Sequence, residues 1–267
     1  MAKSKSIVDL FSAAYARWMS TGLPSRLNDA LLKAVLRARG YQDWSGSGER
    51  WFCAKVLPQV NPHVVLDVGA HRGDYALEVL KNTQAEVHCF EPQPQLCRQM
   101  QHNLAEFGDR VRLIPKGVAA RSGNLNLYCN PESPELASFS AEVNAIPYVD
   151  NSSAIEVEIT TLDQYVLEAG LTRVDFIKID TEGYELEVLQ GAERLLREFK
   201  PAMIQLEFNL HHLLRGTSLY AIASLLPDYD MHQLLPGGWA RRDPMDPFAN
   251  VYRQANFVFL RRGTSIS

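Results

Sequence analysis

Three carboxylates follow two apolar segments near the middle of the sequence, at positions where they could share a site. Asp180 and Glu182 come directly after VDFIKI (174–179), and Glu207 ends the apolar run PAMIQL. A carboxylate beside a hydroxyl group can remove its proton as a general base. Three carboxylates around one point can instead hold Mg²⁺ or Ca²⁺, which polarises the hydroxyl. The sequence leaves both interpretations open.

Two adjacent histidines follow Glu207. Imidazole titrates near neutral pH, so His211 is a further candidate for the base, although we favour ordinary surface positions for His211 and His212. Glu185 begins the helical pattern 185–199, where its charge opposes the helix macrodipole, and we expect a structural role for it. Gly183 is expected to allow a tight bend between strand and helix.

A glycine turn, DVGAHRG (67–73), predicts a cofactor site. Its glycines let the backbone approach a ligand, and the helix expected after it offers free N–H groups. The spacing G-x-x-x-G differs from the G-x-G-x-x-G of dinucleotide-binding turns. A carboxylate at Asp67 would repel a pyrophosphate but suits a cation, such as the ammonium group of S-adenosylmethionine, which carries no phosphate.

Glu91 ends the apolar segment VHCF, 24 residues after Asp67. A carboxylate about 20 residues beyond such a turn is the usual anchor for ribose hydroxyls, and nothing basic beside it would suit a 2′-phosphate. The alternative is that both acids only cap helices. Their joint occurrence around one helix favours cofactor binding.

Segments that predict strands alternate with segments of helical periodicity from residue 63 onward. The expected strands are VVLDVG, VHCFEP, VRLIPKGVAA, NLNLYCN, IEVEITTLD, VDFIKID and PAMIQLEFN, and the expected helices include ALEVLKN, 94–108 and 185–199. This alternation predicts an α/β fold with a doubly wound, Rossmann-like, mostly parallel sheet. Ligands bind beyond the carboxyl ends of such strands, which singles out residues 67–73, 91–92, 117–118, 180–182 and 207–209.

The two ends of the chain differ from this pattern. Residues 1–60 show helical spacing at 7–19 and 26–39, followed by a turn-rich stretch, DWSGSGER. We therefore expect a helical N-terminal extension, serving as a substrate or cap region, before the α/β domain at 61–267. The final apolar segments, DMHQLL and ANFVFLR, predict an antiparallel pair at the sheet edge. The segment 137–154 is long for a connection and is expected to form a lid or a substrate wall.

Charge and composition limit the classes of function. The net charge of −4 argues against strong nucleic-acid binding. Residues 1–60 carry +5 and the remainder −9; we expect a solvated basic face, and the alternative is an acidic substrate, an anionic glycan or peripheral membrane contact. No apolar run is long enough to span a membrane, and the N-terminus is too polar for a secretory signal. Four cysteines without zinc spacing indicate reduced thiols, hence a cytoplasmic protein.

Five motifs resemble, in order and spacing, the FkbM family of S-adenosylmethionine-dependent methyltransferases. They are VVLDVGAHRGDY, VHCFEPQPQL…HNL, GVAARSGNLNLY, TTLDQY and FIKIDTEGYELEVLQGA. The resemblance covers about residues 64–210, and DTEGYE with its following helix is the most specific motif. His71 stands where asparagine is common in the family. This difference has little effect on the expected cofactor binding, because backbone groups make most of the contacts in this turn. The parts outside the resemblance are expected to set substrate choice.

The resemblance implies a class I methyltransferase sheet of seven strands, the seventh antiparallel, with adenine near Val118. The expected residues binding S-adenosyl-L-methionine are Asp67, Gly69, Ala70, His71, Gly73, Glu91, Pro92 and Val118. Family members mostly methylate hydroxyl groups, so we expect O-methylation of a sugar, glycolipid or natural-product acceptor. The alternatives are N-methylation of an amine or peptide, and a non-catalytic protein that uses the fold only to bind.

Overall fold

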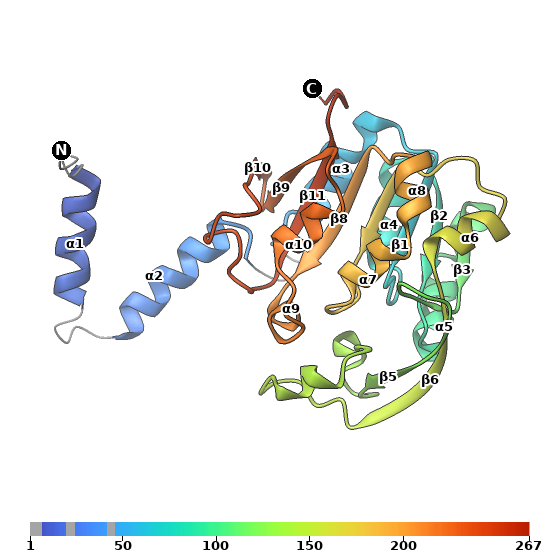
Figure 1. Ribbon diagram of the computed structural model, residues 1–267, viewed down its shortest axis with the longest axis horizontal. Helices are drawn as coiled ribbons and strands as arrows, with labels where there is room; N and C mark the ends of the chain where they lie inside the picture. The colour runs from blue at the N-terminus through green and yellow to red at the C-terminus, as the bar shows by residue number, and fades with distance from the viewer. Residues whose placement is uncertain (1–6, 20–24, 42–45, 267) are drawn as a thin grey trace. The chain divides into compact units, whose positions relative to one another are not determined.

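The computed structural model describes residues 7–19, 25–41 and 46–266, and the chain divides into two compact units, 1–39 and 40–267. The first unit holds the helices α1 (Ile7–Met19) and α2 (Ser25–Ala38) (Figure 1). The first part of the turn-rich stretch, 43–45, lies outside the described residues.

The second unit is built around an eight-stranded sheet in the order β10-β9-β11-β8-β7-β1-β2-β3 (Figure 1). Its parallel core consists of β1 (Val64–Val68), β2 (Glu86–Phe90), β3 (Val111–Ile114), β7 (Phe176–Ile179) and β8 (Met203–Phe208). The expected doubly wound, Rossmann-like sheet is confirmed. Strands β7 and β8 are buried along their whole length because both faces of a parallel sheet are covered.

A strand inside this sheet runs antiparallel to both of its neighbours, as the resemblance implied. It is β11 (Ala255–Arg261), which lies between β8 and β9 (Tyr229–Leu235) and pairs antiparallel with both. The last two apolar segments therefore pair as expected, but β11 lies inside the sheet. The edge is formed by β10 (Gly238–Arg241), which pairs with β9 and brings the sheet to eight strands instead of seven.

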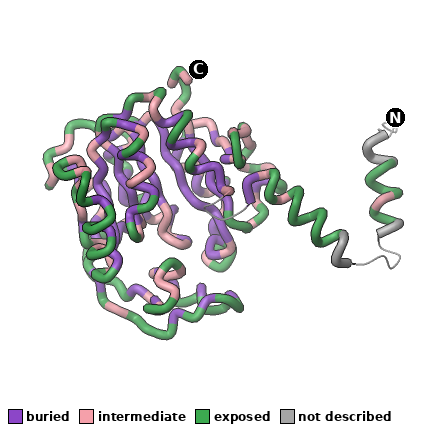
Figure 2. Tube along the Cα trace, turned by 180° about the vertical axis from the view of Figure 1, so that it is seen from behind, coloured by how far each residue is buried: buried purple, intermediate pink, exposed green. Residues whose placement is uncertain are grey.

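Helices cover both faces of the sheet, which is buried between them in Figure 2. The helices are α3 (Glu49–Lys55), α4 (Asp74–Asn82), α5 (Pro94–Asn103), α6 (Leu162–Glu168), α7 (Glu185–Gln190), α8 (Glu193–Glu198), α9 (Leu210–Leu214) and α10 (Leu219–Ser224). Helix α3, which the sequence assigned to the N-terminal extension, lies in the second unit and packs against α4, with Phe52 and Cys53 fully buried. No helix among the described residues is long and apolar enough to cross a membrane.

Three predicted elements are divided in the structure, and one of them is the helix 94–108, which is observed as α5 and a 3-10 helix at Ala105–Arg110. The segment expected as a third strand contributes β3 to the main sheet and β4 (Gly117–Val118) to a small sheet of order β4-β6-β5, with β5 (Gly123–Cys129) and β6 (Ser153–Thr160). The helical pattern 185–199 is interrupted at Gly191, where a Cβ would lie 2.2 Å from the Ala119 carbonyl oxygen. The close approach of this backbone therefore separates α7 from α8.

Candidate active site

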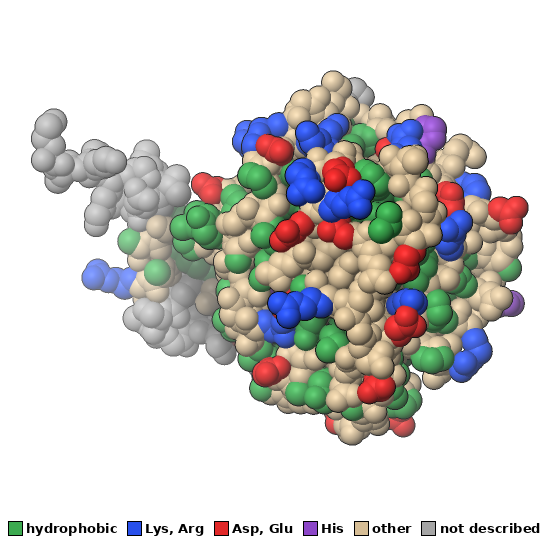
Figure 3. Space-filling view, turned by 45° about the vertical axis from the view of Figure 1, so that its right-hand side comes forward, with side chains coloured by type: hydrophobic (Ala, Val, Ile, Leu, Met, Phe, Trp, Pro, Cys, Tyr) green, Lys and Arg blue, Asp and Glu red, His purple; other side chains and the backbone are tan. Residues whose placement is uncertain are grey.

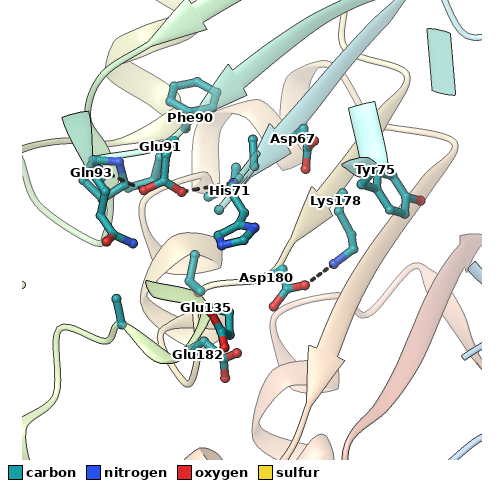
Figure 4. Close-up of a pocket in the computed structure, with 18 of the residues that line it drawn as sticks. Asp67, His71, Tyr75, Phe90, Glu91, Gln93, Glu135, Lys178, Asp180 and Glu182 are labelled. Atoms are coloured by element: carbon teal, nitrogen blue, oxygen red, sulfur yellow. Dashed lines mark hydrogen bonds and ion pairs between the residues drawn. The ribbon is translucent and has the colours of Figure 1, made fainter. Parts of the chain in front are cut away.

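A cavity of about 290 Å³ opens beyond the carboxyl ends of β1, β2, β7 and β8 (Figure 4). Ten of the residues predicted for the site line it: Asp67, Gly69, Ala70, His71, Glu91, Pro92, Val118, Asp180, Glu182 and Glu207. Two others lie just behind its wall. Gly73 directly precedes α4 as its N-cap residue and packs against Met100 and Leu104, and His211 contacts Glu182.

The β1–α4 turn lies directly against the loop that follows β7. Gly69 has φ +80°, and a Cβ at this position would lie 1.7 Å from the Asp180 carbonyl oxygen. The amides of Gly69 and Ala70 both donate to the Phe90 carbonyl, at 3.0 and 2.9 Å. His71 adopts φ +51°, a conformation that only a minority of non-glycine residues adopt. The turn is thus fixed by its neighbours, and Gly69 is required by close backbone approach.

Glu91 lies across the cavity from the β7 loop, with each carboxylate oxygen bound to one backbone amide (Figure 4). The His71 amide donates to Oε2 at 3.0 Å, and the Gln93 amide donates to Oε1 at 2.8 Å. A carboxylate has about four acceptor positions, so each oxygen can accept a further hydrogen bond from a ligand hydroxyl. Burial raises the pKa of Glu91 to about 7.

Asp67 is buried at the carboxyl end of β1, and its Oδ2 has no hydrogen-bond partner among the described residues. Burial raises the pKa of Asp67 to about 7, against the opposing charge of Lys178. A buried polar atom without a partner is costly, and Asp67 lines the cavity, so this carboxyl is a candidate acceptor for a ligand group. The ammonium of S-adenosylmethionine fits this oxygen, and a ribose diol fits Glu91.

Lys178, which sequence reasoning missed, lies inside the apolar strand β7. The strand register aligns it with Asp67 on β1 and Gln205 on β8. Its Nζ is 2.8 Å from Asp180 Oδ2 (Figure 4). It is also 3.6 Å from Glu49 Oε1. Burial opposes the charge, but the two acids outweigh it and raise the Lys178 pKa above its ordinary range. The sequence did contain a signal for this ion pair: a lysine stands within an apolar strand that is buried on both faces, and a buried charge needs a partner.

The surroundings of this ion pair form a buried hydrogen-bond network contributed by α3, α4, β8 and β11. Gln205 Nε2 donates to Glu49 Oε1 at 2.8 Å and to Asn256 Oδ1 at 3.0 Å. The Tyr75 hydroxyl donates to Gln205 Oε1 at 2.6 Å, and the Ser47 hydroxyl donates to Glu49 Oε2 at 2.9 Å. Every member therefore has a partner, as a network in a buried environment requires.

The three predicted carboxylates meet, with one oxygen each of Asp180, Glu182 and Glu207 within 4.8 Å of one another. Asn209 Nδ2 donates to Glu207 Oε1 at 2.7 Å and to Glu182 Oε2 at 2.8 Å. Gln254 Nε2 donates to Glu207 Oε2 at 2.9 Å. Burial, followed by the charges of Asp180 and Glu182, raises the pKa of Glu207 well above its ordinary value.

The expectation that the two histidines lie at the surface is wrong, because both are buried beneath the β7 loop. His211 Nδ1 is 2.9 Å from Glu182 Oε2, and His212 Nε2 is 2.7 Å from Glu185 Oε2. Burial disfavours the charged imidazole of His211, but the hydrogen bond and charge of Glu182 outweigh it and raise the His211 pKa. Helix α9, which begins after Asn209, turns both histidines inward.

Glu185 stabilises the backbone of the β7 loop. Its carboxylate accepts hydrogen bonds from the amides of Thr181, at 2.8 Å, and Gly183, at 3.0 Å. Burial would raise the pKa of Glu185, but the charge and hydrogen bond of His212 and the Thr181 amide hold it below its ordinary value. Glu185 therefore has a structural role, through the loop amides as well as the helix end. Gly183 has φ +100°, and a Cβ there would lie 2.9 Å from His211 Cβ.

The connection 134–152, which contains most of the segment 137–154 expected as a lid or substrate wall, lies along one side of the cavity. Ala137 and Phe139 of the expected segment line the cavity, together with Pro134 and Glu135 just before it. Its buried residues Val143, Ile146 and Val149 pack with Leu136 and with Leu210 of α9. The Ser138 hydroxyl donates to the Glu182 carbonyl at 2.9 Å. The segment is therefore a packed wall attached to the carboxylate loop.

Comparison with known proteins supplies independent findings. A family model described as "Methyltransferase FkbM domain" matches residues 67–232. The 2-O-methyltransferase NoeI of Sinorhizobium fredii is 27% identical over 194 residues, covering 68% of this chain and 78% of that protein. The hexuronic acid methyltransferase AglP of Haloferax volcanii is 24% identical over 143 residues, covering 54% and 55%. A solved O-methyltransferase from Bacillus cereus, in complex with SAH, has a TM-score of 0.46 at 13% identity, covering 93% and 96%.

Proposed function

Since the chain belongs to the FkbM methyltransferase family, we propose that it is an S-adenosyl-L-methionine-dependent O-methyltransferase acting on a hydroxyl group of a sugar-containing acceptor. The observation that carries the proposal is one cavity lined by two sets of acids. Asp67 and Glu91, from β1 and the residue after β2, are taken as its first end, and Asp180, Glu182 and Glu207, from the carboxyl ends of β7 and β8, as its second. The names of the relatives, a 2-O-methyltransferase and a hexuronic acid methyltransferase, support a sugar acceptor.

The first end of the cavity is proposed to hold the cofactor. Asp67 would accept the ammonium group, Glu91 would accept the ribose hydroxyls, and Val118 would contact the adenine. Gly69, Ala70, His71, Gly73 and Pro92 would supply the backbone surface of this end. Bound S-adenosylmethionine supplies an electrophilic methyl group on a sulfonium centre, which leaves as a neutral thioether.

The second end is proposed to position the hydroxyl and to take its proton. As the new C–O bond forms and the C–S bond breaks, the hydroxyl proton becomes strongly acidic, so a carboxylate is a sufficient base. We propose that Asp180 accepts it, because Lys178 fixes Oδ2 at 2.8 Å and leaves Oδ1 for the acceptor. Glu182, backed by His211, and Glu207 would accept hydrogen bonds from neighbouring hydroxyls.

A metal-assisted variant is the second candidate for this end. Carboxylate oxygens from Asp180, Glu182 and Glu207 within 4.8 Å of one another match the spacing of ligands around Mg²⁺ or Ca²⁺. Lys178, Asn209 and Gln254 already bind oxygens of these carboxylates, which favours the general-base variant. Methyl transfer that is unchanged by EDTA would exclude the metal variant, and activity restored by added Mg²⁺ or Ca²⁺ would support it.

The acceptor is proposed to lie between the carboxylates and the wall formed by residues 134–152. Tyr148 in this wall is 65% exposed, and its ring offers a flat surface for the apolar face of a sugar. Residues 1–60 are proposed to influence acceptor choice. The four free cysteines support a cytoplasmic location.

Mass spectrometry tests the proposal directly. The protein is incubated with S-adenosylmethionine and a panel of neutral glycosides, uronic-acid glycosides, glycolipids and amines, and each product is examined for added methyl. Methylation of a hydroxyl is the expected result. Methylation of an amine would support the N-methyltransferase alternative, and cofactor binding without any product would support a binding protein. Calorimetric titration should show S-adenosylmethionine binding while NAD remains silent.

A further inference from the structure

Helix α2 carries an apolar stripe that faces solvent. Leu31, Leu32 and Val35 are 46%, 56% and 55% exposed. Residues three and four positions apart lie on the same side of a helix, so these side chains form one continuous stripe. At 3.6 residues per turn, the exposed side chains of Lys33 and Arg37 lie on the opposite side. Helix α2 is therefore amphipathic, with an apolar face and a basic face.

The unit that contains this helix is strongly basic. Residues 1–39 hold seven Lys/Arg and two Asp/Glu, a net charge of +5, whereas the rest of the chain carries −9. On the face of the second unit in Figure 3, acidic and basic side chains are interspersed. The excess of positive charge thus belongs to the same short unit as the exposed stripe.

This combination matches one class of surface. A helix with leucine and valine on one face, lysine and arginine on the other, and low overall hydrophobicity lies in the plane of a membrane interface. The apolar stripe enters the acyl boundary, and the basic side chains remain at the level of the headgroups. Positive charge near the surface favours anionic lipid, and each basic residue contributes about a fivefold gain in affinity.

We propose that helix α2 binds an anionic membrane surface, with Leu31, Leu32 and Val35 inserted and Lys33 among the headgroups. The first unit then acts as a peripheral anchor for the α/β unit. This inference does not depend on the proposed methyl transfer, because it rests on the charge and exposure of residues outside the cavity.

Vesicle co-sedimentation of the full chain tests the anchor. The protein should sediment with vesicles of phosphatidylcholine mixed with phosphatidylglycerol, and not with phosphatidylcholine alone. Added salt should release it, because exposed charges are screened. The double variant Leu31→Ser/Val35→Ser should bind at least about tenfold more weakly. Lys33→Glu, which reverses one charge, should also weaken binding, by about tenfold or more.

A matched control is available in the other unit. Leu167 of α6 is 66% exposed, so Leu167→Ser removes a leucine at least as exposed as those of the stripe and should leave sedimentation unchanged. Unchanged binding of S-adenosylmethionine by every variant shows that the α/β unit remains folded. Equal binding to both vesicle types, or to neither, overturns the proposal. A dimer that is detected by light scattering and that Leu31→Ser converts to a monomer would also overturn the proposal, because a second copy of the chain would then cover the stripe.

Discussion

Cofactor binding is expected to release protons at neutral pH, because two buried carboxyls at the proposed cofactor end have raised pKa values. Burial raises the pKa of Asp67 and that of Glu91 to about 7. Each group is then about half protonated near pH 7 in the free protein. An ammonium group beside Asp67 and hydroxyl donors at Glu91 favour the ionised forms and lower both pKa values on binding.

The number of protons follows from linkage. If both pKa values return to roughly 4 in the complex, each carboxyl loses about half a proton near pH 7, so about one proton leaves per cofactor. The affinity then rises roughly tenfold between about pH 6.5 and about pH 7.5, and it levels off above about pH 8. The amino group of the cofactor has an ordinary pKa of about 8, so it takes up only a small fraction of a proton near pH 7.

Isothermal titration at one pH in phosphate and in Tris measures this release, because the two buffers differ in their enthalpy of ionisation. The difference in observed enthalpy gives the number of protons. Asp67→Asn and Glu91→Gln should each remove about half of the release, in addition to weakening binding. Enthalpies that agree in the two buffers, together with an affinity that does not change from about pH 6.5 to about 7.5, would refute the reasoning.

Three further changes test other parts of the structure. A carboxyl whose pKa is raised by folding contributes stability that is present at low pH and is lost as the pH rises through about 7. The cofactor-free protein should therefore lose about 1.4 kcal/mol of unfolding free energy per raised carboxyl between about pH 6 and about pH 8. Thermal melts should show a lower midpoint at the higher pH, and a midpoint that rises would contradict the raised pKa values. Gly69→Ala should destabilise by about 3 kcal/mol or more in urea titrations, because its Cβ would meet the Asp180 carbonyl at 1.7 Å. Gly170→Ala is the control, since φ is +64° there but no atom of the described residues lies within 4 Å of the added Cβ. A loss of only about 1 kcal/mol is expected for it, and equal losses would show that close approach is not the cause. Asp180→Asn should lower kcat by about 10²-fold or more while leaving cofactor affinity within about twofold, measured by product formation and titration; an unchanged kcat would exclude Asp180 as the base.

Much of this architecture could be predicted because its signals are local. The alternation of apolar strands with helices gave the doubly wound sheet, and polar residues at strand ends indicated which side chains share an edge. Asp67 and Glu91 are 24 positions apart in the chain yet line one cavity, because parallel strands end at the same side. The turns and acids at these ends required no knowledge of distant contacts.

The parts that could not be predicted depend on contacts between distant segments. The partner of Lys178 on its second side is Glu49, which belongs to a helix that precedes the sheet. Nothing in the local pattern indicates that α3 packs within the sheet unit, so the domain limit at residue 60 was drawn after it. The histidines were expected at the surface because only the turn of α9 directs them inward. The edge strand β10 is short, and it is defined only by its pairing with β9.

The cavity wall and the sheet differ in how freely their sequences can change. The close contact of Gly69 with the Asp180 backbone couples the cofactor turn to the carboxylate loop, so a change in one of these loops requires a matching change in the other. The wall before β6 packs mainly on its own apolar cluster, and it contacts the site through Leu210 of α9 and through the Ser138 hydroxyl, which donates to the Glu182 carbonyl. Under the proposed function, an exchange of residues 134–152 between relatives is expected to alter the acceptor while the sheet and the β1–α4 turn stay the same, when the contacts of this wall to Glu182 and Leu210 are kept.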